Sequence, residues 1–277
     1  MKIALVSMRP KISDKKSNLQ KMQNYIEKTK ADLYVFGELS LTGYCIKDEV
    51  RDLAENIIDG ASITYMKKLA EKNKCYISFG MPTQDPVVQG LIHNTAVFIH
   101  PNGKVDTYNK WFMPTFGPFE EKIFYDEGEK LTVCKTKFGK IGLIVCYDIF
   151  FPELCRAYSM LGADIILCLS ASPSITRKYF ETLMPARAVE NTLFFIYVNL
   201  VGTQEDLVFW GGSQVYDPLA NLLVKAPYFK ESIVTCDVDL EQVKLARAVR
   251  PVLRDIRPQI YQDLYEISRN HVKIKKR

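Results

Sequence analysis

The sequence lacks the motifs that mark common metal and nucleotide sites. It contains no Cys-x-x-Cys pair, no Gly-x-x-x-x-Gly-Lys-Ser/Thr loop and no Gly-x-Gly-x-x-Gly run. Its three histidines, at positions 93, 100 and 271, have no spacing typical of zinc ligands, either to each other or to a cysteine pair. We therefore expect neither a zinc centre nor a phosphate-binding loop of these types.

Features of secreted and membrane proteins are also missing. The seven cysteines are an odd number and lie mostly inside apolar runs, which favours free thiols in a reducing compartment over a disulfide framework. The start, MKIALVSMRP, has only a short apolar stretch before Arg9 and Pro10. No stretch approaches the roughly 18 apolar residues of a membrane span. We therefore expect a cytoplasmic protein without a signal peptide or a membrane partner.

An excess of charge of one sign is absent from most of the chain. Lys and Arg number 37 and Asp and Glu 32, which gives a formal charge of +5. Four of the cations lie in residues 271–277, so the remainder carries a surplus of one (5 − 4 = 1). Nucleic-acid-binding proteins typically carry a basic field, and the KIKKR end is better explained as a solvated terminus. We expect no nucleic-acid partner.

The sequence does contain an alternation of strand-like and helix-like segments in a chain of 277 residues, long enough to bury a core without disulfides. Helices are expected from Ser13 or Asp14 to about residue 30, over 61–73, from Pro152 onward, over 177–191 with a kink or restart at Pro185, and in parts after Asp239. Strands are expected over 2–8, 32–37, 75–80, 94–100, 105–109, 131–136, 141–145, 164–169, 193–200, 208–215 and 232–237. Hairpin turns among them favour an α/β fold of mixed sheets with helices outside. We expect one domain over residues 1–277, with 246–277 as a C-terminal arm.

Three polar residues directly follow strand-like segments. Cys146 ends the apolar run 141–145, where a strand feeding a helix presents a thiol beside backbone N–H groups and can lower its pKa. Glu38 follows the strand 32–37, where a buried carboxylate is costly unless it is used or paired. Lys110 follows the strand 105–109 among aromatic residues. Each also has a simpler interpretation: a buried hydrophobe for the cysteine, a helix or turn cap for the glutamate and an exposed hairpin residue for the lysine.

Together these segments resemble the nitrilase, or carbon–nitrogen hydrolase, family over nearly the whole chain. The glutamate segment matches at 37–39 and 42–44 (Gly-Glu-Leu and Thr-Gly-Tyr), and the lysine segment at 108–110 (Tyr-Asn-Lys). The cysteine segment matches at 146–148 and 151–153 (Cys-Tyr-Asp and Phe-Pro-Glu), and a later run matches at 185–191. The resemblance implies a four-layer α-β-β-α sandwich whose helix layers pair across a dimer and often build a larger assembly.

The resemblance further implies a thiol amidohydrolase that requires no metal and no organic cofactor. Glu38 would take the thiol proton of Cys146, which attacks a carbonyl carbon. The ammonium of Lys110 and the backbone N–H of Tyr147 would face the developing oxyanion, and water would then hydrolyse the thioester. A further family glutamate matches the second of two adjacent acids, Glu121, because it directly precedes a basic residue. It would orient the lysine or the water.

Within the family, several segments are most similar to the glutaminase domain of glutamine-dependent NAD synthetases, although the synthetase half is absent here. These segments are 115–117, 119–122, 170–173, 197–202, 207–209 and 211–213. Ser172 matches a substrate-binding serine, and Arg177 or Lys178 is a candidate partner for a substrate carboxylate. Phe116 stands where that subfamily has a tyrosine that helps to hold the glutamine. It belongs to an aromatic set suited to an uncharged acyl group, namely Trp111, Phe112, Phe116, Phe119 and Trp210.

We therefore expect a thiol amidase that releases ammonia from a small carboxamide and prefers a neutral amide to glutamine. Alternatives are hydrolysis of a nitrile, of an N-carbamoyl amine or of glutamine as an ammonia supply, and, outside enzymes, a catalytically silent interaction scaffold. A homodimer or larger homo-oligomer is expected, with residues 146–161 and 177–191 at the contact and the arm after Arg250 reinforcing it. The apolar residues expected to contribute are Leu154, Tyr158 and Leu161.

Overall fold

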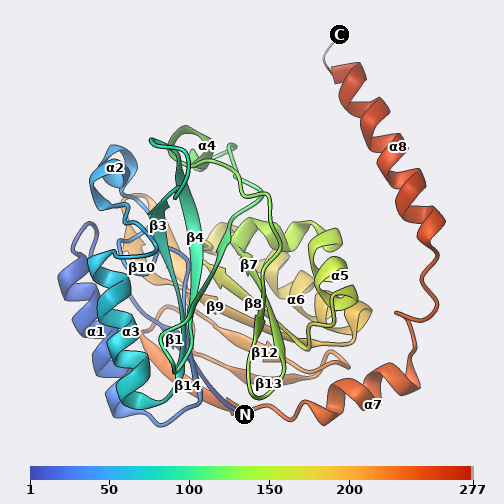
Figure 1. The fold of residues 1–277 in the computed structure, drawn as a ribbon, viewed down its shortest axis with the longest axis horizontal. Helices are drawn as coiled ribbons and strands as arrows, with labels where there is room; N and C mark the ends of the chain where they lie inside the picture. Colours follow the sequence, from blue (N-terminus) through green and yellow to red (C-terminus); the bar gives the residue numbers. More distant parts are fainter. Residues whose placement is uncertain (276–277) are drawn as a thin grey trace.

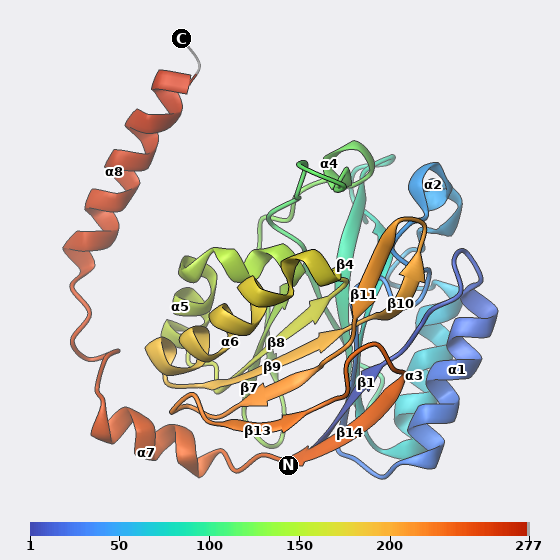
Figure 2. The same cartoon turned by 180° about the vertical axis from the view of Figure 1, so that it is seen from behind.

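The computed structural model describes the backbone of residues 1–275 and the side chains of residues 1–271. Two six-stranded sheets pack face to face, and helices cover the outer face of each sheet (Figure 1, Figure 2). Both sheets mix parallel and antiparallel pairs. The α/β fold class expected from the sequence, a four-layer α-β-β-α sandwich, is therefore confirmed.

The first sheet has the strand order β14-β1-β2-β3-β4-β5. β1 (Lys2–Ser7), β2 (Leu33–Phe36) and β3 (Tyr76–Gln84) are parallel, whereas β4 (Ile92–Ile99), β5 (Val105–Asn109) and β14 (Ser232–Asp237) are antiparallel to the strands they join. Both faces of β1 are buried. Ile3 and Leu5 face the core between the sheets, and Ala4 and Val6 face the helices. This two-sided burial explains why the first strand reads as a continuous apolar run.

The second sheet has the order β13-β12-β9-β8-β7-β6. β7 (Lys140–Val145), β8 (Ile165–Ser170) and β9 (Phe194–Asn199) are parallel, whereas β6 (Val133–Lys135), β12 (Gln214–Tyr216) and β13 (Leu222–Lys225) pair antiparallel. A separate hairpin joins β10 (Val201–Gln204) to β11 (Leu207–Trp210). The single strand expected over 208–215 is wrong. Gly211 and Gly212 adopt φ values of +64° and +60°, and this turn separates β11 from β12.

Two pairs of helices form the outer layers. α1 (Lys15–Lys28) and α3 (Ala61–Asn73) cover the first sheet, and α5 (Pro152–Met160) and α6 (Arg177–Asn191) cover the second (Figure 1). Asp14 caps α1, since its carboxylate accepts a hydrogen bond from the backbone N–H of Ser17 at 3.0 Å. Short helical turns complete the chain: η1 (Lys47–Glu49), α2 (Val50–Leu53), α4 (Glu121–Phe124), η2 (Cys146–Phe150) and η3 (Ser174–Thr176).

The restart expected at Pro185 and the contact between copies expected of Leu154 and Tyr158 are both wrong. α6 continues through Pro185 without a restart, because Phe180, Met184 and Ala188 are buried against the sheet and hold the helix in place. Leu154 and Tyr158 of α5 are buried in their own protomer, where the Tyr158 hydroxyl donates to the Leu143 carbonyl at 2.7 Å. These two residues cannot contribute to a contact between copies.

The C-terminal segment leaves the sandwich after α7. α7 (Glu241–Val249) packs on the body through Val243 and Ala246, whereas α8 (Pro258–Lys275) stands away from it in both views (Figure 1, Figure 2). The arm expected over 246–277 thus begins inside α7, and its part beyond Arg250 departs from the body. No helix within residues 1–275 has the apolar length needed to cross a bilayer.

Candidate active site

Glu38, Lys110 and Cys146 come together beyond the ends of β2, β5 and β7. Lys110 Nζ donates to Glu38 Oε1 at 2.7 Å, and both side chains are completely buried. Cys146 begins η2 directly after β7 and is 8% exposed, and the charges of Glu38 and Lys110 act on its thiol. The site therefore combines side chains from both sheets.

Both oxygens of Glu38 accept hydrogen bonds. Oε1 accepts from Lys110 and from Asn94 Nδ2, each at 2.7 Å, and Oε2 accepts from the backbone N–H of Ala171 at 2.8 Å. The turn that carries Glu38 lies directly on β3, where a Cβ at Gly80 would stand 2.2 Å from the backbone nitrogen of Leu39. A glycine at position 80 is therefore required for this approach.

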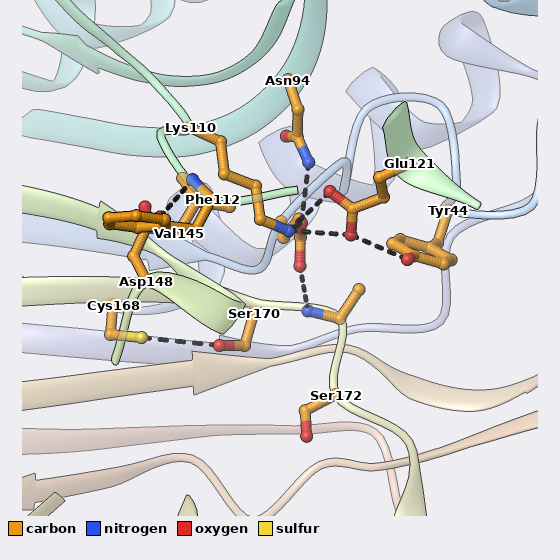
Figure 3. A network of polar contacts seen from close by, with 12 residues as sticks. Tyr44, Asn94, Lys110, Phe112, Glu121, Val145, Asp148, Cys168, Ser170 and Ser172 are labelled. Carbon is orange, nitrogen blue, oxygen red and sulfur yellow. Dashed lines mark hydrogen bonds and ion pairs between the residues drawn. The ribbon is translucent and has the colours of Figure 1, made fainter. Parts of the chain in front are cut away.

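Lys110 lies between two carboxylates. Besides Glu38, its ammonium donates to both oxygens of Glu121, at 2.8 and 2.7 Å, and the Tyr44 hydroxyl donates to Glu121 Oε1 at 2.8 Å. Figure 3 shows the lysine reaching toward Glu121, with Tyr44 on the far side of that carboxylate. Glu121 is 4% exposed, whereas its neighbour Glu120 is exposed. Of the two adjacent acids, the structure brings Glu121 to the lysine.

Asp148 holds the backbone on either side of the site. Its Oδ2 accepts from the Tyr108 hydroxyl at 2.8 Å. Oδ2 also accepts from the Val145 N–H at 2.9 Å, and Oδ1 accepts from the Phe112 N–H at 3.0 Å (Figure 3). The turn between Val145 and Asp148 contains Cys146, whose φ of +46° lies in the left-handed region that L-residues seldom adopt. Asp148 thus ties the turn of the cysteine to the loop after Lys110.

Burial dominates the ionisation of the site. Burial raises the pKa of the Cys146 thiol well above its ordinary value, and the negative charge of Glu38 adds to this, while Lys110 opposes it. The lowered thiol pKa expected at this strand end is therefore wrong. Burial also raises the pKa of Glu121, against the opposing effect of Lys110. For Lys110 burial acts to lower the pKa, but Glu121 and Glu38 outweigh it and hold the pKa well above its ordinary value.

Cys146 opens into a mainly apolar cavity of about 230 Å³. Phe116, Tyr147 and Ser172, expected at the substrate site, all line it. Of the aromatic set expected there, Phe119 also lines it, whereas Trp111, Phe112 and Trp210 do not. Phe112 stacks on Phe151 with ring centroids 3.4 Å apart, and Trp210 is buried in the core. The remaining aromatic lining comes from residues that the sequence did not single out: Tyr44, Phe150, Tyr179 and Phe180.

The basic residues expected to bind a substrate carboxylate lie elsewhere. The Arg177 guanidinium lies over the Tyr228 ring, 4.8 Å from its centroid, and 3.8 Å from a Glu181 carboxylate oxygen. Lys178 is exposed, and neither residue lines the cavity of Cys146. Both expectations are wrong for this cavity because the first turn of α6 directs these side chains to other partners or to solvent. Ser172 Oγ is within hydrogen-bond distance of Thr176 and Trp210 side chains.

Comparison with known proteins identifies the family. The sequence profile described as carbon–nitrogen hydrolase matches residues 2–248. The chain belongs to the carbon–nitrogen hydrolase family. A probable nitrilase of Schizosaccharomyces pombe is 30% identical over 270 residues, covering 95% of this chain and 97% of that protein. The glutamine-dependent NAD(+) synthetase of Acinetobacter baylyi is 29% identical over 276 residues, covering 98% of this chain but 50% of the synthetase.

Solved structures of carbon–nitrogen hydrolases have the same fold. An amidase from Nesterenkonia sp. AN1 superimposes with a TM-score of 0.82 at 26% identity, covering 95% of this chain and 96% of that chain. In that structure, of a glutamate-to-glutamine mutant, the acetamide moiety of fluoroacetamide is covalently added to the active-site cysteine. Together with the family match, this makes the chain a hydrolase of carbon–nitrogen bonds other than peptide bonds.

The sequence left three polar residues of the hydrolase site unassigned. Tyr44 and Asp148 lie inside the family segments quoted above, so the sequence did contain a signal for these two residues. Asn94 stands at the start of an apolar strand, where a fully buried amide calls for a partner. The N–H of Ala171 is a backbone donor, 133 residues from Glu38, and has no side-chain signal in the sequence.

Proposed function

We propose that this hydrolase cleaves a small, uncharged carboxamide through a thioester on Cys146 and releases ammonia. The observation that carries the proposal is the fixed ammonium of Lys110, bonded to Glu38 and Glu121 beside a thiol that opens into an apolar cavity. A fixed cation stabilises negative charge that develops on a carbonyl oxygen, and the arrangement supplies a base and a nucleophile next to it.

The first step forms the bond between sulfur and carbon. Glu38 takes the proton of Cys146 Sγ as the sulfur attacks the carbonyl carbon of the amide. Because burial raises the pKa of the thiol, the proton leaves only as the new bond forms. The carbonyl oxygen becomes an oxyanion that faces the Lys110 ammonium and the backbone N–H of Tyr147. Loss of one donor of this kind typically raises the barrier by about 3–4 kcal/mol.

The second step breaks the bond between carbon and nitrogen. The proton held by Glu38 passes to the departing nitrogen, which leaves as ammonia, and a thioester remains on Cys146. A water molecule then attacks the thioester carbon while Glu38 accepts one of its protons. The carboxylic acid leaves, and the proton returns to the sulfur. Glu121 keeps the Lys110 ammonium in position throughout the reaction, because both of its carboxylate oxygens accept hydrogen bonds from that ammonium.

The lining of the cavity favours a substrate with a neutral acyl group over glutamine. Glutamine brings an α-ammonium and an α-carboxylate that need charged or polar partners, whereas the walls here are largely aromatic. Phe116 has no hydroxyl group, and Arg177 and Lys178 do not line the cavity. We therefore propose that small aliphatic or aromatic amides have a higher kcat/KM than glutamine.

The test is ammonia release from a panel of substrates: propionamide, benzamide, glutamine, an N-carbamoyl amine and a nitrile. We expect the neutral amides to lead, Cys146→Ala to retain less than about one part in a thousand of the activity, and intact mass to detect an acyl adduct on the wild-type cysteine. Phe116→Tyr should narrow the ratio of neutral amide to glutamine, while Phe229→Tyr, on an equally exposed ring outside the cavity, should not.

Each alternative function predicts a different result in this substrate panel. Glutamine as the best substrate would overturn the proposed acyl preference. A nitrile or an N-carbamoyl amine in the lead would change the substrate class but retain the role of Cys146. Absence of both ammonia release and an adduct would support a silent interaction scaffold, the alternative against which the intact and buried Glu38–Lys110 pair argues.

A further inference from the structure

The run over 185–191, which matches the family, has no role in the mechanism proposed above. It forms the last part of α6, and its Arg187 is only 6% exposed although the side chain is charged. A buried guanidinium is costly unless its N–H groups find acceptors. The acceptors of Arg187 therefore indicate what this residue does.

The guanidinium of Arg187 reaches from α6 to the turn that carries the nucleophile. Its Nε donates to the Ile149 carbonyl at 2.9 Å, and this bond is buried. Ile149 belongs to η2, the turn that begins with Cys146, and is completely buried. Buried backbone carbonyls need a donor, and water cannot replace the arginine at this one. The Phe150 ring of η2 also packs edge-on against Phe180 of α6, with centroids 5.6 Å apart.

The orientation of the guanidinium is fixed from its other side. Its Nη1 donates to Glu190 Oε1 at 2.8 Å. The backbone carbonyl of Glu190 accepts in turn from Arg156 Nη2 of α5, at 2.6 Å. Charge-assisted bonds of this kind are stronger than those between neutral groups. Arg187 thus fastens the Ile149 carbonyl to a helix that is itself tied to its neighbour.

The turn η2 is therefore held at both ends. The last residue of β7 donates its N–H to Asp148, and Arg187 donates to the Ile149 carbonyl further along. Between these two bonds lie Cys146, with its φ of +46°, and Tyr147, whose N–H faces the oxyanion in the proposed mechanism. A strained turn keeps its shape only where its surroundings hold it, and an oxyanion donor works only in a narrow range of positions.

We propose that Arg187 is a positioning residue of the hydrolase. By holding the Ile149 carbonyl, it directs the Tyr147 N–H toward the carbonyl oxygen of the substrate, while β7 holds the sulfur of Cys146. Arg187 does not line the cavity of Cys146, so it acts through η2. The inference rests on the proposed function, because the oxyanion belongs to that mechanism.

Arg187→Met tests the proposal, because methionine fills much of the same space without a donor. For the best substrate of the panel we expect kcat to fall by about 50-fold with KM changed by less than about twofold, since a misplaced N–H affects the transition state more than the bound substrate. Arg247→Met is the matched control. Arg247 Nη2 donates to the Ala163 carbonyl at 2.7 Å, outside the site, and its loss should leave kcat unchanged.

Alkylation by iodoacetamide separates positioning from general damage to the site. The Cys146 sulfur displaces iodide from this reagent, and no oxyanion forms in that step. The rate constant of alkylation, followed by mass spectrometry of the Cys146 peptide, should differ by less than about threefold between wild type and Arg187→Met. Arg187→Lys keeps the charge and one donor group and should lower kcat by only about fivefold, which gives a result even where the methionine variant does not fold.

Three results would overturn this inference alone: a kcat of Arg187→Met within about twofold of the wild type, an equal loss of kcat in Arg247→Met, or a loss of alkylation parallel to that of turnover. A wild type that hydrolyses no compound of the panel would overturn the proposed function, and the positioning role of Arg187 with it.

Discussion

At the scale of single residues, Lys110 is a fixed charge and not a proton donor. Its ammonium makes three bonds to two carboxylates, and these hold its pKa well above the ordinary value although burial acts to lower it. In the proposed mechanism, a group this reluctant to lose its proton stabilises the oxyanion without transferring a proton to it. We therefore assign proton transfer in the proposed mechanism to Glu38, whose oxygens accept hydrogen bonds from donors on three different segments.

Glu121→Gln tests whether the position of Lys110 matters for the rate. The substitution removes the negative charge and one of the two acceptor oxygens on this side, so the ammonium is held more weakly there and shifts toward Glu38. We expect kcat to fall by about 100-fold with KM nearly unchanged, because the misplacement affects the transition state more than the bound substrate. Glu127→Gln, an exposed acid paired with Lys122, is the control. A rise in KM at constant kcat would show that Glu121 binds substrate instead.

The chemistry-bearing residues were predictable from the sequence because each stands at the end of a recognisable strand. Their supporting contacts were not, because they join distant segments: Asn94 is 56 residues from Glu38, and the Ala171 N–H is 133 residues away. The ionisation of Cys146 was predicted with the wrong sign. A strand end alone suggests exposure to backbone N–H groups, but burial depends on the packing of both sheets.

At the scale of elements, the strained turn η2 depends on Asp148. This side chain accepts from backbone N–H groups on both sides of the site, at Val145 and Phe112. Asp148→Asn keeps the shape but replaces one acceptor oxygen by an NH2 group, so at least one N–H loses its partner. We expect kcat to fall by about 100-fold as Cys146 and the Lys110 loop shift relative to each other, measured by ammonia release on a folded protein. Full activity of the variant would show that the turn holds without this carboxylate.

The stability of this element should also depend on pH. Burial raises the pKa of Asp148 from 3.8 to about 6, so between these values the folded protein binds a proton that the unfolded chain does not. The contribution to the free energy of unfolding is therefore complete below pH 3.8 and is lost as pH rises through 6. Urea unfolding measures the free energy of unfolding of wild type and of Asp148→Asn. The difference between these two free energies should shrink by the order of 2 kcal/mol between pH 4 and pH 7. A difference independent of pH would contradict this.

Elements with a strong local pattern were predicted closely, such as the helix over 61–73 and the strand over 105–109. The failures have different causes, a tertiary contact in one case and local turn residues in the other. α6 passes Pro185 because its apolar face is buried, and the run over 208–215 breaks at two glycines that allow a second hairpin. The short helix α4, which carries Glu121, is a single turn fixed by its contacts. It is therefore too short to show a helical repeat of apolar residues in the sequence.

At the scale of the whole molecule, α8 presents an apolar stripe that its own body does not cover. Ile260, Leu264 and Ile267 recur at helical spacing and are 51%, 46% and 64% exposed. Met160 and Leu161 at the end of α5 are 55% and 51% exposed. Unpartnered apolar surfaces of this kind mark contacts between chains. Because of these exposed apolar surfaces, we still expect a homodimer that is reinforced by the C-terminal arm.

Light scattering at micromolar concentration tests this assembly. We expect the mass of a dimer or a larger multiple of the 31.8 kDa chain. Ile260→Glu/Leu264→Glu should lower the mass toward that of a single chain at the same concentration, because it places charge in the apolar stripe. Gln262→Glu, on another face of α8, should not. A strictly monomeric wild type would refute the expectation.

The raised pKa of the Cys146 thiol has a consequence for the durability of the free protein. The thiolate form of cysteine is the nucleophile that attacks peroxides and alkylating agents, so a sulfur kept as a thiol reacts slowly with them. In the proposed mechanism, proton transfer to Glu38 and formation of the sulfur–carbon bond coincide when an amide is bound. We therefore expect the sulfur to become nucleophilic only when substrate is bound, and the thiol of the resting protein to react slowly with peroxides.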